Sequence, residues 1–359
     1  MKYTYTQRDI GKLLKKVIKK KIVDVLPMEM AKNCVYTKED IVNTVLFSVL
    51  NNNFIEYGSK RLRSNGLTAP SSDTVFYHLN KLGKREVFST FQRVDSEMLK
   101  QARRCGIFKK AAWGGLDIHK MPYFGKHKDR NVIGMERVRG TSYGYGYASI
   151  ECVNTKEPFT LAALPLDQLT TKKEIITKLV NEARKHVKID RLFLDRGFFN
   201  VESIEALIDL KVPFIIPAVR NKRIKRIISE AHIKSQKIPA TKCYASITDY
   251  TMKKGKHSVT MKLVVILELK GNEWGEFAYV TNMNVALENA LELANSYRSR
   301  WGIETGYRVK ENVRGKTCST HYATRLTVVI HNSLQSMATL QSHRKHKNKV
   351  GKEKTSDHP

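Results

Sequence analysis

The sequence predicts an α/β fold in which a mixed β-sheet is flanked by helices, follows a helical domain and is interrupted by an all-β insertion. Three changes of pattern support this prediction. Residues 1–105 show helical periodicity, residues 106–236 mix strand-like and helical runs, and residues 237–285 contain strand-like runs. A helical pattern resumes over 286–340, and the basic, polar tail of 341–359 is expected to be disordered. With 359 residues, the chain is long enough for two or three domains.

The N-terminal domain is predicted to bind DNA through a helix-turn-helix. The stretch LTAPSSDTVFYHLNKLG opens a helix at Ser71, with Val75, Leu79 and Leu82 as its buried stripe. A short helix, a turn and a second helix with polar outward residues is typical of this motif, although any small helical bundle gives a similar pattern. Four polar residues are expected to face outward and contact DNA: Thr74, Tyr77, His78 and Lys81.

The second region is predicted to form a sheet with a parallel part. The strand-like runs AAWGGLDIHK, NVIGMERV, YGYASIECV and FTLAALPL come first. They are followed by the amphipathic helix KKEIITKLVNEARKHV, the strand DRLFLDRGFF, the helix VESIEALIDL and the strand VPFIIPAV. Strands that alternate with helices in this way indicate an α/β sheet. Gly144 and Gly146 in YGYGY indicate close packing at a strand edge.

The charge balance indicates a nucleic-acid partner. The chain has 64 Lys and Arg against 34 Asp and Glu, a formal net charge of +30. These basic residues are spread along the whole chain, which favours DNA over an anionic membrane surface, and no apolar run reaches transmembrane length. The five cysteines are widely spaced without a CxxC pair, so we expect a reducing cytoplasm. There is no GxxxxGK[ST] phosphate loop, so we expect no nucleotide cofactor.

Three acidic residues are candidates for a metal site. Asp117 follows WGGL and Asp195 follows RLFL, so both are expected at strand ends, where a parallel sheet gathers its ligands. Glu304 lies among cations in NSYRSRWGIETGYRVKENVRGKT, on the helical face of Tyr297 and Arg300. Each acid alone could cap a helix or pair with a nearby arginine. Together they could bind Mg²⁺, for which Mn²⁺ could substitute, because these ions prefer hard oxygen ligands.

Basic and aromatic residues beside these acids are candidates for phosphate contacts. An arginine suits this role because its planar guanidinium matches a phosphate with two hydrogen bonds. One group surrounds the candidate glutamate, and the other lies in the run RNKRIKR near the expected carboxyl edge of the sheet. A solvated charge run is the alternative for the second group. The candidates are Tyr297, Arg300, Lys310, Arg220 and Arg223.

Two motifs resemble those of insertion-sequence DDE transposases. LFLDRGFFN resembles their second-Asp motif, and YRSRWGIETGYRVK resembles their Tyr-Arg-Glu-Lys signature at Tyr297, Arg300 and Glu304. Lys310 lies six positions after Glu304 (310 − 304), one fewer than in the signature. GLDIHKMPYFGK and WGIETGYR look most like the transposases of archaeal, halobacterial-type elements. The resemblance covers residues 106 to 330 and includes the β-strand insertion.

This resemblance implies an RNase H-like fold in which Asp117, Asp195 and Glu304 bind the metal. It also implies an enzyme that cuts DNA at element ends and joins a 3′-hydroxyl to target DNA. The expected partners are terminal inverted repeats and target DNA, with a homodimer in the DNA complex and a nucleoid-associated location in a prokaryotic cytoplasm. Two alternatives stay open: a non-catalytic DNA-binding protein derived from a transposase, and an RNase H-like nuclease or resolvase without strand transfer.

Overall fold

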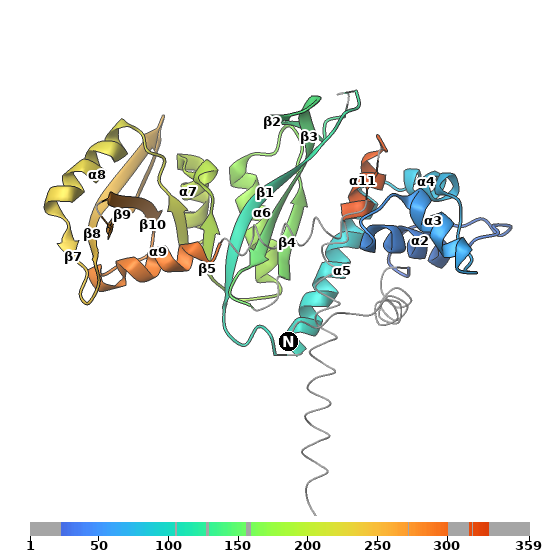
Figure 1. Cartoon of the computed structure of the whole chain (residues 1–359), viewed down its shortest axis with the longest axis horizontal. Coiled ribbons are helices and arrows are strands. Elements are labelled where there is room, and N and C mark those ends of the chain that lie inside the picture. Colours follow the sequence, from blue (N-terminus) through green and yellow to red (C-terminus); the bar gives the residue numbers. More distant parts are fainter. Residues whose placement is uncertain are drawn as a thin grey trace, which may run out of the picture. The chain divides into compact units, whose positions relative to one another are not determined.

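The computed structural model divides into two compact units, one helical and one built on a β-sheet (Figure 1). The division places residues 1–109, 123–126 and 305–359 with the helical unit and the remainder with the sheet unit. None of the helices in the described part of the chain is long and apolar enough to cross a membrane. The structure describes residues 23–104, 106–126, 129–155, 159–271, 273–300, 316–317 and 319–329.

The helical unit combines four N-terminal helices with one from near the C-terminus. Its described helices are α2 (Lys38–Leu50), α3 (Ile55–Ser64), α4 (Ser72–Asn80), α5 (Lys84–Arg104) and α11 (Tyr322–Val329). Helix α11 packs against α4 and α5, and the Thr324 hydroxyl lies 2.7 Å from Asn80 Oδ1. This differs from the expectation that the whole of 286–340 belongs to the sheet domain. Local periodicity shows that a helix has an apolar face but not which distant helices cover it.

Helix α4 is the second helix of the predicted helix-turn-helix. The Ser71 side chain accepts a hydrogen bond from Thr74 N, which caps the helix, and the stripe of Val75, Leu79 and Leu82 is buried as expected. The expectation that His78 faces outward is wrong, because this residue is only 7% exposed. A position three residues after Val75 returns to the buried side of the helix. Burial and nearby Lys81 lower the pKa of His78, which favours the neutral ring.

The other unit is built on one mixed sheet. Its strand order is β2-β3-β1-β5-β6-β10-β9-β8-β7, and β4 pairs with β3. The strands are β1 (Ala112–Pro122), β2 (Val132–Val138), β3 (Thr141–Cys152), β4 (Phe159–Pro165), β5 (Ile189–Leu194), β6 (Phe214–Pro217), β7 (Gln236–Lys237), β8 (Cys243–Lys254), β9 (His257–Lys270) and β10 (Glu273–Thr281).

The centre of this sheet has an RNase H-like topology, as the sequence predicts. Strands β1, β3 and β4 are antiparallel neighbours, and β5 and β6 then add in parallel to β1. Each parallel strand is preceded by a helix, α6 (Lys172–Arg184) before β5 and α7 (Val201–Asp209) before β6. The apolar face of the amphipathic helix α6 is buried, including Ile175, Ile176 and Leu179.

The all-β insertion extends this same sheet. Strand β10 pairs antiparallel with β6, with Tyr279 opposite Pro217 and Val280 opposite Ile216, and β9 and β8 follow. The backbone groups of β6 are thereby paired instead of forming an open sheet edge. The expected strands are present, and the strand pairing shows that the sheet runs through the insertion without interruption. Helix α8 (Lys222–Lys234) packs against β8 and β9.

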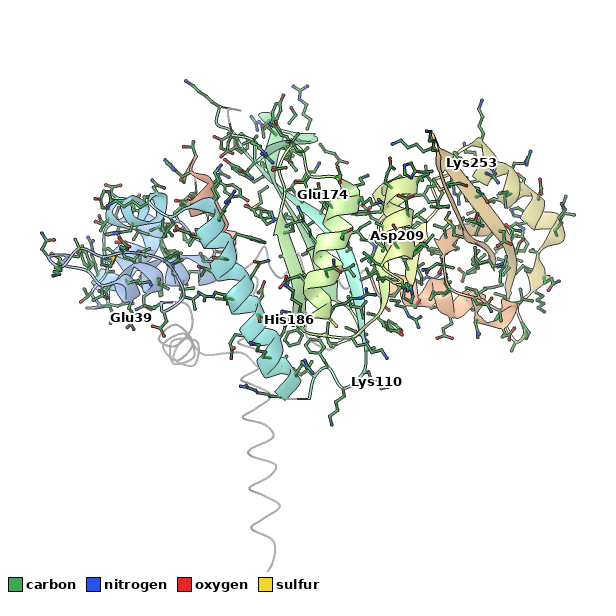
Figure 2. The ribbon with its side chains drawn as sticks, turned by 180° about the vertical axis from the view of Figure 1, so that it is seen from behind. Glu39, Lys110, Glu174, His186, Asp209 and Lys253 are labelled. Carbon is green, nitrogen blue, oxygen red and sulfur yellow. The ribbon has the colours of Figure 1, made fainter. Side chains whose placement is uncertain are left out.

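Helices cover both faces of the sheet. Helices α6 and α7 lie in front of the strands in Figure 2, where Glu174 and Asp209 mark them, whereas α9 (Ala290–Arg298) lies in front in the opposite view of Figure 1. On the α9 face, Leu293 and Tyr297 of the helix share a buried cluster with Phe193 of β5. Side chains alternate between faces along a strand, so Phe193 marks the side that α9 covers.

The two glycines of YGYGY lie where strands pack closely, as expected, but β3 lies between β1 and β2 and not at an edge of the sheet. A Cβ at Gly144 would lie 2.5 Å from the Met121 carbonyl oxygen and 2.7 Å from Met135 Sδ. At Gly146 a Cβ would lie 2.4 Å from Ile133 Cδ1. These glycines let β3 pass between β1 and β2.

We expect Gly144→Ala to lower the free energy of unfolding by about 1–3 kcal/mol, because the added methyl meets backbone that cannot move aside. Gly134→Ala is a matched control in the same hairpin, since a Cβ there has no atom within 4 Å. It should change the free energy of unfolding by less than about 0.5 kcal/mol. Urea denaturation of both variants checks the prediction, and an equal effect at the two positions would contradict it.

Candidate active site

The register of two parallel strands places Asp117 and Asp195 next to each other. Gly115 pairs with Phe193 and Leu116 pairs with Leu194, so the aspartates occupy the next position on β1 and directly after β5. Neighbouring strands lie about 5 Å apart. Asp195 follows its strand as expected, but Asp117 lies within β1, because β3 continues to pair with β1 as far as Pro122.

Both aspartates lie on the face of the sheet that α9 covers. Asp195 is two residues past Phe193, and Asp117 is two past Gly115, the partner of Phe193. The Phe193 ring makes an edge-on contact with Tyr297 of α9, with ring centroids 6.1 Å apart. Because side chains alternate along a strand, the two carboxylates point to the same side as this aromatic pair.

Each carboxylate is fixed in direction by a backbone donor of its own segment. Ile118 N donates to Asp117 Oδ1 at 2.9 Å, and Gly197 N donates to Asp195 Oδ1 at 2.8 Å. Both side chains are half-buried. These two donors fix the direction of carboxylate oxygens of the kind that divalent cations prefer as ligands.

The segment that carries Asp195 is held from both faces of the sheet. From the α9 side, the Tyr297 hydroxyl donates to the Leu194 carbonyl oxygen at 3.1 Å. Burial raises the pKa of Tyr297 to about 12, so the hydroxyl keeps the proton that it donates. From the α6 side, Lys172 Nζ donates to the Gly197 carbonyl oxygen. Tyr297 is only 8% exposed, so the geometry supports a positioning role for this residue more than a contact with DNA.

The strands of the insertion also support this segment. Phe199, four residues after Asp195, stacks on Tyr250 of β8 with ring centroids 6.3 Å apart. The Arg223 guanidinium lies 4.5 Å from the centroid of the Tyr250 ring and donates to the Thr251 carbonyl oxygen at 2.7 Å. Arg223 therefore braces the strand that supports the aspartate segment.

Arg220 is also bound within the protein. Its guanidinium donates to Glu276 Oε2 at 3.0 Å and to the Glu276 carbonyl oxygen at 2.7 Å. A phosphate contact by Arg220 or Arg223 would have to replace these interactions. The geometry therefore favours a structural role for the two arginines that we expected to contact DNA.

The remaining candidates around the signature are only partly placed. Arg300 is half-buried just after α9, and its guanidinium lies 5.7 Å from the centroid of the Tyr297 ring. Glu304 and Lys310 lie outside the described residues. Within the described ranges, no group of three His, Cys, Asp or Glu side chains is close enough to hold a metal ion. The two aspartates supply hard oxygen donors that suit a divalent ion, and Glu304 remains the candidate for a third ligand.

The candidate DNA contacts of the helical unit differ in exposure. Tyr77 is 59% exposed, and Lys81 lies over its ring with Nζ 3.9 Å from the centroid. Thr74 is half-buried, with its hydroxyl 2.8 Å from the Ser71 hydroxyl. Tyr77 and Lys81 are therefore open to a ligand, whereas His78 belongs to the packing of the unit.

Sequence reasoning missed Lys172, which fastens α6 to the Asp195 segment. Its acceptor lies 25 residues further along the chain, at Gly197, and no local pattern indicates a pair with that separation. Arg196 was also missed as a candidate. It is exposed beside Asp195, and the signal was its position in the LDRGF motif.

An RNase H-like sheet with two adjacent acidic side chains on β1 and after β5 is the arrangement of nucleic-acid-processing enzymes of the transposase and nuclease type. The chain matches the transposase DDE domain family over residues 139–336, more than half of its length, and therefore belongs to that family. The matched range contains Asp195, Tyr297 and Glu304 and begins after Asp117. No curated protein matches the chain.

We expect Tyr297→Phe to lower the free energy of unfolding by about 1 kcal/mol at pH 8, because it removes a buried hydrogen bond and keeps the ring. The pKa in the folded state, about 12, lies above the unfolded value near 10. The folded state then binds the proton more tightly, so this stabilisation is present below pH 10 and declines as pH rises toward 12. The difference between wild type and variant should shrink over that range.

Denaturation of both proteins at pH 8, 9, 10 and 11 measures this difference. Tyr143→Phe is the control, since Tyr143 is 40% exposed on β3 and should show a smaller effect. A difference between wild type and Tyr297→Phe that stays constant with pH would contradict the assignment.

Proposed function

We propose that this protein is a DNA transposase that cuts phosphodiester bonds at the ends of a mobile element and joins the 3′-hydroxyl to target DNA. The observation that carries the proposal is the adjacency of Asp117 and Asp195 on neighbouring parallel strands. Membership of the transposase DDE domain family makes DNA the expected substrate. The Tyr-Arg-Glu-Lys pattern supports the finer assignment to the insertion-sequence group, and the segments GLDIHKMPYFGK and WGIETGYR support the archaeal, halobacterial type.

Asp117, Asp195 and Glu304 would hold Mg²⁺, with Mn²⁺ as a substitute. Bound there, the metal would polarise the phosphodiester, activate the attacking oxygen and stabilise the leaving oxygen. Glu304 is seven residues from Tyr297, whose hydroxyl is fixed to Leu194 beside the aspartate pair. Seven residues span at most about 25 Å, and this limit is compatible with Glu304 as a third ligand beside the aspartate pair.

The chain's own residues would orient the DNA and the carboxylates. Tyr297 and Lys172 hold the Asp195 segment from opposite faces, so the carboxylate keeps its direction when DNA binds. Arg196 is exposed directly beside Asp195, where a guanidinium can neutralise a phosphate next to the cut. Arg300 and Lys310 are proposed to contact phosphates on the other side of the glutamate.

The helical unit would recognise the terminal inverted repeats through α4. Tyr77 on this helix and Lys81 at its end are exposed, and Thr74 lies one turn before Tyr77. A protein that acts on two element ends is expected to work as a homodimer in its DNA complex. Recognition of the ends and the chemistry would then reside in different units of the chain.

The test is an assay of cutting and joining with Mg²⁺ on DNA that carries the terminal repeats flanking the gene. We expect Asp195→Asn and Glu304→Gln each to lower the cutting rate more than about 100-fold, because each removes a metal ligand. DNA affinity should stay the same or rise slightly, since a negative charge near phosphates is lost. Glu230→Gln on α8 is the control with the same charge change and should cut normally, because Glu230 is half-exposed and pairs with Arg226.

The outcomes separate the alternatives. Cutting without joining would favour an RNase H-like nuclease or resolvase. Specific binding by the wild-type protein with neither reaction would favour a DNA-binding protein derived from a transposase. Cutting by Glu304→Gln at the wild-type rate with saturating Mg²⁺ would remove this glutamate from the metal site.

A further inference from the structure

Strands β2 and β3 continue beyond the rest of the sheet as a two-stranded hairpin, here called the arm (residues 134–143). The pairing of β1 with β3 ends at Pro122 and Gly144. Beyond this point, Gly134 pairs with Tyr143 and Val138 with Thr141, and within the described part of the chain no third strand joins them. Figure 1 shows β2 and the start of β3 at the end of the sheet where β1 finishes.

The arm has a tight turn at its tip and is fixed to the sheet at its root. At the tip, the chain turns at Gly140, which has a φ of 92°. At the other end, Gly144 fits between the Met121 carbonyl and the Met135 side chain without room for a methyl group. Lys120 Nζ donates to the Gly134 carbonyl oxygen at 2.8 Å, which ties β1 to β2 at the root of the arm. These contacts fix the root of the arm on the sheet.

Two guanidinium groups at the tip are open to a ligand. Arg137 and Arg139 are exposed, and among the described residues neither has an ion-pair or hydrogen-bond partner. This separates them from Arg220 and Arg223, which bind carbonyl and carboxylate groups of the protein. Exposed arginines that make no contact within the fold can each bind a phosphate with two parallel hydrogen bonds.

The arm extends from the same edge of the sheet as the aspartates. Asp117 lies opposite Ser149 on β3, and β1 runs from Asp117 toward Pro122 at the root of the arm. The root at Gly144 is five residues from Ser149, and Thr141, which pairs with Val138 next to Arg139, is eight. At about 3.4 Å per residue, the arm therefore covers the range from about 17 to about 27 Å beyond the aspartates.

We propose that the arm grips the phosphate backbone of the DNA on one side of the cut, through Arg137 and Arg139. Successive phosphates of one strand lie about 3.4 Å apart along a duplex axis, so for an arm that runs along the duplex a reach of about 17–27 Å corresponds to about five to eight nucleotides from the cut phosphodiester. The contact holds the duplex in register and reads no bases. The proposal rests on the proposed function, because it takes the aspartate pair as the place of cutting.

The test compares the full-length wild type with the double variant Arg137→Gln/Arg139→Gln. The probe is a duplex of one terminal repeat and its flank, in Ca²⁺ for binding and in Mg²⁺ for cutting. Binding is measured by fluorescence anisotropy over a series of NaCl concentrations. Loss of two phosphate contacts should lower the slope of log K against log salt by about two. Hydroxyl-radical footprinting should show lost protection about five to eight nucleotides from the cut.

Two matched variants make the result specific. Lys178→Gln/Lys185→Gln, on α6 and directly after it, also removes two positive charges, here from exposed ion pairs. This variant should leave the slope and the footprint unchanged. Arg137→Lys/Arg139→Lys keeps both charges and should restore most of the slope. Thermal denaturation followed by circular dichroism checks that each variant is folded.

Three outcomes would overturn the proposal. An unchanged slope and footprint in a wild type that cuts would show that the arm does not hold DNA, while the proposed function stands. Equal losses in the arm and α6 variants would show a general effect of net charge. A wild type that neither binds the repeat nor cuts it would remove the proposed function, and the arm's role with it.

Discussion

The parallel pairing of β1 with β5 is the constraint on which the site depends. Leu116 lies opposite Leu194, and the next residue on each chain is an aspartate. A register shift of one residue would turn one carboxylate to the opposite face, where Leu192 and Leu194 are buried beneath the helices. Burial of an unpaired carboxylate among apolar side chains is costly, so the apolar pattern of both strands also enforces the position of the acids.

Several side chains that pack around β5 hold the segment that carries Asp195 in position. Tyr297 and Lys172 bind the backbone on either side of this residue, and Phe199 anchors the following turn on Tyr250. The insertion therefore has a structural task near the chemistry. It completes the sheet edge at β6 and supplies the aromatic surface under the aspartate segment. Loss of its strands would loosen the site even if no insertion residue touched DNA.

The parts of the fold that the sequence predicted are those with a local signal. The buried face of α6, the Ser71 cap and the strand before Asp195 each follow from residues within one turn or one strand. The α/β sheet with a parallel part followed from the alternation of strands and helices, and its RNase H-like fold was implied by the resemblance of the motifs around two of the acids. Fold and family were therefore accessible without coordinates.

The sequence did not predict features of the fold that depend on residues far away in the chain. His78 is buried because the other helices of its unit cover that side of α4, and the 3.6-residue period alone does not locate the edge of a buried stripe. The internal bonds of Arg220 and Arg223 were not predicted, because Glu276 and Thr251 lie far along the chain; their contact with DNA stays a prediction. The merging of the insertion with the main sheet depends on the β6–β10 pair, whose short contact has no sequence signature.

Binding of Mn²⁺ to the DNA-free protein, followed by electron paramagnetic resonance, tests most directly whether the three acids form one metal site. The wild type and the single variants Asp117→Asn, Asp195→Asn and Glu304→Gln are titrated at the same pH and salt. If the three side chains share a metal, each substitution should weaken the affinity by at least about tenfold. An affinity that Asp195→Asn lowers but Asp117→Asn and Glu304→Gln leave unchanged would contradict a site built from all three.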